Sequence, residues 1–141
     1  VVRSELELAM ENHLRVLYLS NDNWPEAHVE YRFIVDRRFR FDFAFLDIKL
    51  AVECEGGLFI RQVRCNNCGN LVMRKLKSGK MVKVFAGGRH NTGSGAIKDM
   101  EKYNLAVQMG WLVLRYNKAM IDSGEAINQI ERIVHERISG S

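Results

Sequence analysis

Two carboxylates, Asp42 and Glu53, have the spacing in this sequence that most directly suggests chemistry. They stand in two runs of alternating apolar and charged residues, 39–45 and 50–55, on either side of a short turn at 47–48. If the runs form an antiparallel hairpin centred on that turn, facing residue numbers add to 95 and Asp42 faces Glu53. Directly opposed side chains have Cβ atoms about 4.5–5.5 Å apart, so the two charges repel. A divalent cation such as Mg²⁺ or Mn²⁺, which binds carboxylate oxygens, would relieve that repulsion.

The same hairpin has a simpler interpretation, in which no ion binds. Alternating strands commonly carry charge on the solvent side, and Asp42 could pair with Arg40 or Arg32 there. The register also places Arg40 opposite Glu55. The alternation predicts one apolar face, formed by the phenylalanines, and one charged face. A register slip of one residue would separate the two acids.

A basic segment occupies the middle of the chain. Between Leu58 and His90 there is no acidic residue, whereas the rest of the chain holds seventeen acidic and thirteen basic residues. Localised positive charge is typical of a protein that binds a polyanion such as DNA, and a solvated loop is the alternative. The candidate DNA-binding residues are Arg61, Arg64, Arg74, Lys75, Lys77, Lys80, Lys83 and Arg89.

A C-x-x-C pair lies inside the basic segment. Cys65 and Cys68, followed by a glycine, have the pattern of a zinc knuckle, but a closed zinc site needs four ligands. Because no second C-x-x-C is present, His90, His28 or a second subunit would have to complete a Zn²⁺ site. The alternative is a degenerate knuckle that depends on the neighbouring hairpin. An odd total of three cysteines is typical of a reducing, intracellular compartment, so we expect a cytoplasmic location.

Hydrophobic periodicity indicates the elements that must position these groups. The chain of 141 residues is expected to form one α/β domain over 1–141, with a mixed sheet flanked by helices and a basic insert at 58–90. No apolar run approaches the ~18–20 residues that cross a bilayer, so we expect no membrane partner. The predicted elements are a helix at 4–19, strands at 28–33, 39–45 and 50–55, a hairpin around 78–79, a helix at 96–109, a strand at 111–116 and a helix at 123–138.

Several of these runs resemble the PD-(D/E)XK nuclease superfamily, and more narrowly the small phage and bacterial endonucleases related to very-short-patch repair endonucleases. The resemblance extends from about residue 5 to residue 116, leaving out the cysteine-bearing insert, and the predicted αβββαβ order agrees with that superfamily's restriction-endonuclease-like core. The runs that carry it are EYRF at 30–33, RRFRFDFA at 37–44, KLAVECEGG at 49–57, GRH at 88–90, G-x-G at 93–95, D-x-EKYN at 99–104 and GWLVLR at 110–115.

The resemblance implies a Mg²⁺- or Mn²⁺-dependent endodeoxyribonuclease that hydrolyses phosphodiester bonds. Branched, mismatched or site-specific DNA would be its substrate, a bacterium or a phage-infected cell its setting, and a homodimer a common assembly. By position, Asp42 and Glu53 would be metal ligands, with the backbone carbonyl of Cys54 as a third. Glu5 or Glu30 could complete the acidic cluster.

The superfamily motif ends in lysine, and here Glu55 stands in that place. Glu55 could be a further ligand, a base that orients water, or a structural partner of Arg40. Lys102 on the second predicted helix could supply the missing cation. His90 resembles the histidine that does acid–base or phosphate work in the very-short-patch group, and Arg89 would contact a phosphate. If Glu55 and Lys102 both fail in these roles, the site is inactive.

Two other functional classes stay open at the level of sequence. The chain could be a catalytically inactive nucleic-acid-binding module that keeps the nuclease fold and binds through its basic insert. More distantly, it could be a zinc-ribbon adaptor that binds protein.

Overall fold

The computed structural model of the protein describes residues 3–56, 61–86 and 93–140. The chain divides into two compact units, which we call the core unit (Val1–Gly56 with Met100–Ser141) and the insert unit (Gly57–Asp99). The insert expected at 58–90 thus belongs to a unit that continues to Asp99.

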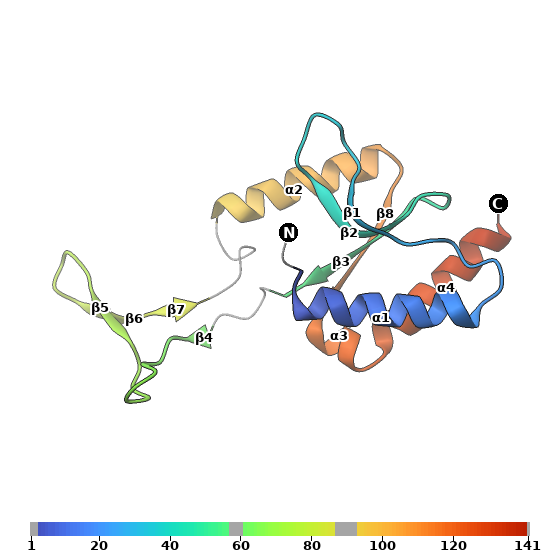
Figure 1. The fold of residues 1–141 in the computed structure, drawn as a ribbon. Coiled ribbons are helices and arrows are strands. Elements are labelled where there is room, and N and C mark those ends of the chain that lie inside the picture. The colour runs from blue at the N-terminus through green and yellow to red at the C-terminus, as the bar shows by residue number, and fades with distance from the viewer. Residues whose placement is uncertain (1–2, 57–60, 87–92, 141) are drawn as a thin grey trace. The chain divides into compact units, whose positions relative to one another are not determined.

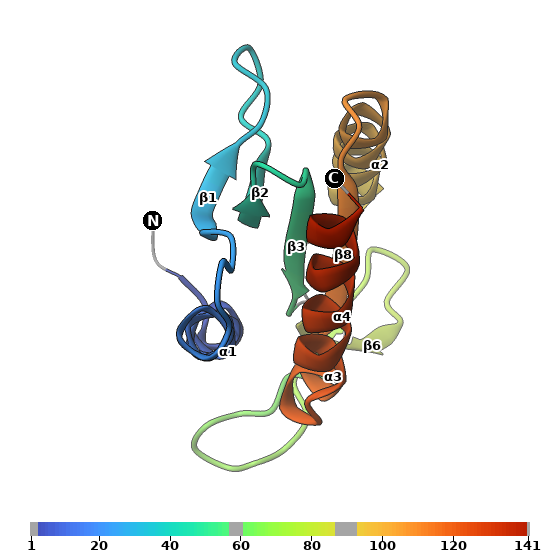
Figure 2. The same cartoon turned by 90° about the vertical axis from the view of Figure 1, so that its right-hand side faces the viewer.

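The core unit is built on a four-stranded mixed sheet (Figures 1 and 2). The strands lie in the order β1-β2-β3-β8, with β1, β2 and β3 antiparallel and β3 parallel to β8. The helix α2 begins within the insert unit and continues into the core unit. The elements are α1 (Glu5–Ser20), β1 (His28–Arg32), β2 (Arg40–Phe45), β3 (Leu50–Glu55), α2 (Gly93–Gln108), β8 (Leu112–Asn117), α3 (Lys118–Asp122) and α4 (Glu125–Ser139).

The first helix begins where its capping signal predicts. The Ser4 hydroxyl accepts a hydrogen bond from the backbone of Glu7, and the Glu7 carboxylate accepts one from the backbone of Ser4 at 2.7 Å. This reciprocal pair satisfies two backbone donors that the first turn leaves open. Met10, Leu14 and Leu17 then recur at helical spacing and are buried against the sheet.

The hairpin of β2 and β3 has the register predicted from the sequence. Phe43 pairs with Val52 and Phe45 with Leu50, and in each pair the residue numbers add to 95. The turn of this hairpin includes Lys49, which has a left-handed backbone (φ 47°). The hairpin therefore brings Asp42 and Glu53 to neighbouring positions just beyond the last described pair of the ladder.

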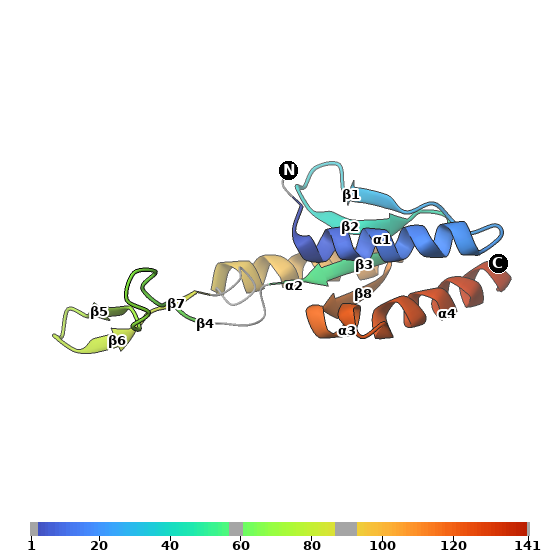
Figure 3. The same cartoon turned by 60° about the horizontal axis from the view of Figure 1, so that its bottom comes forward.

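Both faces of the sheet are covered, which corrects the prediction of one apolar and one charged face. Phe43 and Phe45 pack in the larger cluster with α1, α3 and α4, whereas Phe41 packs in a second cluster with Ala106 of α2 and Trp111. Figures 1 and 3 show α1 and α4 on one side of the sheet and α2 on the other. Sequence alternation could not reveal the second layer, because α2 lies about fifty residues further along the chain.

The ladder between β1 and β2 is interrupted at one position. Val29 pairs with Phe43 and Tyr31 with Phe41, but no pair joins Glu30 to Asp42, which lie between them. Glu30 also has a left-handed backbone (φ 53°), a conformation that costs a non-glycine residue about 1 kcal/mol or more. Such local distortions of a ladder change where side chains point and are common beside functional sites.

The insert unit is organised by backbone pairing. Val63, Val72 and Val84 form a closed ring of three backbone hydrogen bonds of 2.8–3.0 Å. None of the side chains described in residues 63–84 is buried. Its strands are β4 (Arg61–Gln62) with β7 (Phe85–Ala86), and β5 (Met73–Lys75) with β6 (Met81–Lys83), the hairpin predicted around residues 78–79.

Two local features differ from expectation. The C-terminal helix predicted at 123–138 is α4, and a short helix that was not predicted, α3, precedes it; Gly124, with a left-handed backbone (φ 84°), lies between them. The helix predicted at 96–109 begins three residues earlier, at Gly93. Across the described ranges, no helix combines the length and apolarity that crossing a lipid bilayer requires.

Candidate functional site

The carboxylates of Asp42 and Glu53 meet where β2 and β3 stop pairing. Beyond the Phe43–Val52 pair, the Asp42 side chain replaces a backbone partner, because its Oδ2 accepts the Cys54 N–H at 2.7 Å. The carboxyl groups of Asp42 and Glu53 are also close enough to share a hydrogen bond. The hairpin thus holds two acids in contact at a fixed place in the sheet.

A lysine from α2 completes this group. The Lys102 ammonium forms an ion pair with Glu53 Oε1, and both side chains are largely buried. Lys102 Nζ also lies 5.6 Å from the centre of the Phe41 ring, which helps to fix its position over the sheet. The structure therefore joins Asp42, Glu53 and Lys102, residues that are far apart in the sequence.

Two further carboxylates lie beside Asp42. Oxygens of Glu7, Glu30 and Asp42 are all within 4.8 Å of one another, and the three side chains are partly buried. Glu30 reaches this position from the interrupted part of the ladder, and Glu7 from the first turn of α1. We call Glu7, Glu30, Asp42 and Glu53 the acidic cluster.

The electrostatics of the acidic cluster favour a cation. Burial raises the pKa of Glu53 to about 8, since desolvation and the Asp42 charge outweigh the attraction of Lys102. Burial also raises the pKa of Asp42, against the hydrogen bond from the Cys54 N–H. Burial, a hydrogen bond with Glu7 and the charge of Asp42 raise the pKa of Glu30. Carboxylate oxygens are the ligand type that hard divalent cations bind, so Glu7, Glu30 and Asp42 form a candidate cation site.

Glu55, which stands in place of the motif lysine, is bound by groups on other elements. Arg115 Nε donates a hydrogen bond to Glu55 Oε1 at 2.7 Å, and the Tyr103 hydroxyl donates one to the same oxygen at 3.2 Å. The Arg115 guanidinium lies 4.3 Å from the centre of the Tyr103 ring. Arg40 was expected opposite Glu55, but its Nη1 lies 3.8 Å from Glu30 Oε2 instead. The β2–β3 ladder does not reach Arg40, because its described pairs end at Phe43.

The α1 carboxylate that lies beside Asp42 is that of Glu7, whereas Glu5 was the residue named from the sequence. Glu5 is exposed at the start of the helix and is not one of the three grouped carboxylates, whereas Glu30 is. In the sequence, the only signal that singles out Glu7 is the capping box that it forms with Ser4. That signal explains the hydrogen bonds between Glu7 and Ser4 but does not predict that Glu7 lies near β2.

Two predicted residues of the glycine-rich segment, Arg89 and His90, lie outside the described residues. Six of the eight basic candidates have described side chains, and all six are exposed; Arg61 is placed by its backbone in β4. The six exposed side chains are Arg64, Arg74, Lys75, Lys77, Lys80 and Lys83.

The cysteine pair lies on a tight turn. The Gly69 N–H donates to the Cys65 carbonyl at 2.9 Å, and the Cys65 N–H donates to the Asn70 carbonyl at 2.8 Å. Gly69 has a left-handed backbone (φ 72°), which glycine adopts without a steric penalty. Cys65 is half-buried and Cys68 exposed, and both are free thiols. Cys54 lies in the core unit, where burial raises the pKa of its thiol.

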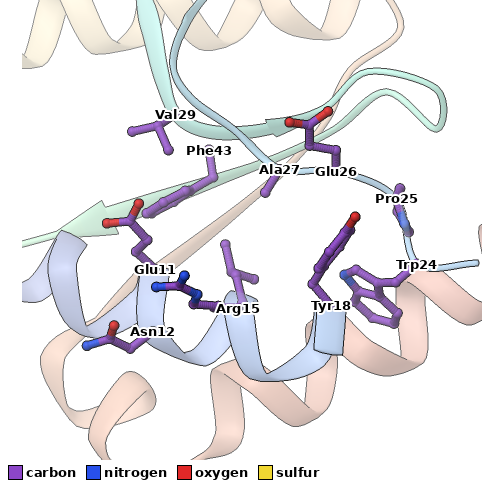
Figure 4. A pocket seen from close by; sticks show the side chains of 11 residues that line it. Glu11, Asn12, Arg15, Tyr18, Trp24, Pro25, Glu26, Ala27, Val29 and Phe43 are labelled. Atoms are coloured by element: carbon purple, nitrogen blue, oxygen red, sulfur yellow. The ribbon is translucent and has the colours of Figure 1, made fainter. Parts of the chain in front are cut away.

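A hollow of about 530 Å³ lies between α1 and the segment leading into β1 (Figure 4). Glu11, Arg15 and Tyr18 of α1 line one side of it, and Trp24 lies at one end. No member of the acidic cluster lines this hollow. Trp24 is only 6% exposed and belongs to the larger hydrophobic cluster.

Compared with protein-family models, curated proteins and solved structures, the chain has no match. Its function is therefore inferred from the chemistry of the site rather than from a relative.

Proposed function

We propose that the chain is a metal-dependent endonuclease that hydrolyses phosphodiester bonds in DNA. The observation that carries the proposal is the meeting of Asp42, Glu53 and Lys102 at the point where β2 and β3 separate. The element order α1-β1-β2-β3-α2-β8 also agrees with the restriction-endonuclease-like core that the sequence resemblance implies.

In this proposal, Asp42 and Glu53 hold the divalent ion. The Cys54 N–H donates to Asp42 of β2, and in an extended strand the N–H and the carbonyl of one residue face the same neighbouring strand. We therefore propose the Cys54 carbonyl as the third ligand. A bound ion of this kind lowers the pKa of a water molecule and offsets negative charge on a phosphate.

Lys102 supplies the ammonium that the motif lysine supplies in the superfamily. Its contact with Glu53 places it at the acidic cluster although it comes from α2 rather than β3. An ion bound by Glu53 would compete with the Lys102 ammonium for that carboxylate, and the ammonium would then be available to neutralise charge on a phosphodiester oxygen. Glu55 then acts as a positioning residue, because its bonds to Arg115 and Tyr103 tie β3 to β8 and α2 beside Glu53.

The insert unit supports a DNA substrate through its charge. On the hairpin of β5 and β6, Met73 pairs with Lys83 and Lys75 with Met81, so two lysines and two methionines share one face. Lysines bind DNA phosphates, and methionines can insert between stacked base pairs. Such contacts give affinity that depends strongly on salt.

The direct test is the conversion of supercoiled plasmid to open-circular or linear DNA in Mg²⁺ and in Mn²⁺, with EDTA as the metal-free arm. We expect cleavage in both metals and none in EDTA. Asp42→Asn and Glu53→Gln should each abolish cleavage, whereas Asp47→Asn, an exposed acid at the other end of the same hairpin, should not. Cleavage that survives both site variants, or that persists in EDTA, would contradict the proposal.

A second candidate function is a nucleic-acid-binding module without catalysis. It is favoured by one observation, the replacement of the motif lysine by a glutamate that Arg115 and Tyr103 already engage. Salt-sensitive DNA binding with no cleavage in either metal, for the parent chain and the Asp42→Asn variant alike, would select this function over the nuclease.

A further inference from the structure

The described side chains of residues 63–84 in the insert unit form no buried core. No described side chain in residues 63–84 is buried, and Met73 and Met81 are 42% and 51% exposed. Its order comes from the ring of backbone hydrogen bonds among Val63, Val72 and Val84, and from the short ladders on either side. Small units that cannot bury enough apolar surface generally depend on a disulfide, a metal or a partner subunit.

The C-x-x-C turn of this unit is closed by hydrogen bonds. The Cys65 carbonyl and N–H are both used in closing the turn, and Arg64 donates to the Gly69 carbonyl at 3.0 Å. The backbone N–H groups of Cys68 and Asn67 donate hydrogen bonds to the Cys65 sulfur. Donors directed at a sulfur favour its thiolate form, which is the form that binds a metal.

The ligand count then decides what kind of site this can be. Between Leu58 and His90 the sequence has no aspartate or glutamate, and its only histidine is His90. The segment can therefore offer at most three ligands: Cys65, Cys68 and His90. A closed tetrahedral zinc site needs four, so at least one ligand must come from outside the segment.

We propose that the Cys65–Cys68 turns of two copies of this chain together bind one Zn²⁺ through four thiolates, so that zinc joins two chains through their insert units. A twofold axis through the metal supplies four identical ligands and takes nothing from the core unit. The exposure of Cys68 leaves that thiol accessible to a second copy.

Charge complementarity favours the tetrathiolate. One Zn²⁺ with four thiolates carries a formal charge of about −2, and soft sulfur ligands are those that zinc prefers in structural sites. The exposed lysines and arginines of two insert units would otherwise repel each other. The anionic centre offsets part of that repulsion, and added salt screens the remainder.

The test uses the full chain, purified in a non-thiol reductant and passed through metal-free buffer after zinc loading. Zinc per chain is measured by mass spectrometry, and molar mass by light scattering before and after chelation. We expect one zinc for every two chains and a dimer that becomes a monomer when zinc is removed. After Co²⁺ replaces zinc, thiolate-to-cobalt charge transfer should have the intensity of four thiolates for each metal.

Matched variants separate this site from the others that zinc could occupy. The pair Cys65→Ser with Cys68→Ser should lose both the zinc and the dimer, while circular dichroism shows the helices of the core unit intact. Asp42→Asn with Glu53→Gln, which disables the acidic cluster, should retain both. His90→Ala should also retain both, because the proposed site does not use that histidine.

Three outcomes would overturn the shared site. These are one zinc per chain in a monomer, loss of zinc in His90→Ala, and no zinc retained by the parent chain. None of the readouts includes DNA or Mg²⁺, so the zinc site and the nuclease proposal can fail independently.

Discussion

The core unit and the insert unit are stabilised in different ways. In the core unit, two clusters of buried side chains cover both faces of one sheet, with Phe43 and Phe45 in one cluster and Phe41 in the other. In the insert unit, the side chains described in residues 63–84 are at most half-buried, and backbone hydrogen bonds carry the order.

The difference matches the two tasks of the proposed nuclease. Catalysis needs carboxylates and an ammonium held in a fixed geometry, which a packed sheet provides. Attraction of a polyanion needs exposed positive charge, which does not require a rigid core. The described basic side chains of residues 63–84 lie where no side chain is buried, and the acidic cluster lies in the unit whose sheet is covered on both faces.

Deleting one core side chain should give the largest effect. Phe45 is fully buried, so we expect Phe45→Ala to lower the free energy of unfolding by about 3–5 kcal/mol through lost burial and a residual cavity. Met81→Ala, which truncates an exposed side chain of the insert unit, should change it by no more than about 0.5 kcal/mol. Urea denaturation followed by circular dichroism measures both, and equal losses would show that the two units are stabilised alike.

The acidic cluster should exchange stability for activity. We expect Asp42→Asn to slow plasmid cleavage at least about 100-fold, which corresponds to about 2.7 kcal/mol of transition-state stabilisation. The same variant should raise the free energy of unfolding without metal, because it removes a charge from beside Glu30 and Glu53. Single-turnover cleavage and urea denaturation without metal are the measurements. A destabilised variant would mean that the Asp42 charge is not a cost to the fold.

Substitutions of lysines in the insert unit should lower the affinity for DNA and leave the free energy of unfolding nearly unchanged. Lys75→Ala and Lys83→Ala are each expected to weaken binding to duplex DNA and to reduce the slope of log Kd against log salt by about one. Lys118→Ala is the matched control, because Lys118 is an exposed lysine of the core unit that pairs with Asp122. Fluorescence anisotropy over a salt series gives both quantities. An unchanged slope in the two insert variants would remove the insert from the DNA interface.

The smallest expected effect is on the pH dependence of the free energy of unfolding, and it comes from the buried Tyr116. Burial raises the pKa of Tyr116 from its ordinary value of 10 to about 12, and its hydroxyl donates to Gln129 at 2.8 Å. Tyr116 therefore ionises in the unfolded chain before it does in the folded protein. The stabilisation that its neutral hydroxyl provides is present below pH 10 and is lost as the pH rises toward 12. Tyr116→Phe should cost about 1 kcal/mol near neutral pH, and the difference should narrow between pH 10 and 12. Urea denaturation of the parent chain and of Tyr116→Phe at several pH values gives the difference in their free energies of unfolding. A difference that stays the same at every pH would contradict the raised pKa of Tyr116.

Short-range features were predictable from the sequence. The capping box at Ser4 and Glu7 set the start of α1, and the turn at residues 47–48 set the register of β2 with β3. Both depend on neighbours a few residues apart, so local chemistry is sufficient. The same register brought Asp42 and Glu53 together, which is the half of the candidate site that sequence arithmetic could reach.

Long-range features were not predictable in the same way. Nothing near Glu7 in the sequence indicates that it lies beside Glu30 and Asp42, and nothing near Glu55 indicates Arg115 as its partner. The short helix α3 also escaped prediction, because the apolar stripe of α4 carries no signal for a helix before it.

The sequence by itself determined the order of the elements, the pairing of the central hairpin and the segregation of positive charge into one segment, because each depends on local periodicity or composition. The tertiary structure alone decided that α2 covers the second face of the sheet, that Lys102 reaches Glu53, and that Glu7 joins the acidic cluster. These contacts join residues that are at least 23 positions apart in the sequence. Packing of whole elements, rather than any local preference, fixes which side chains meet.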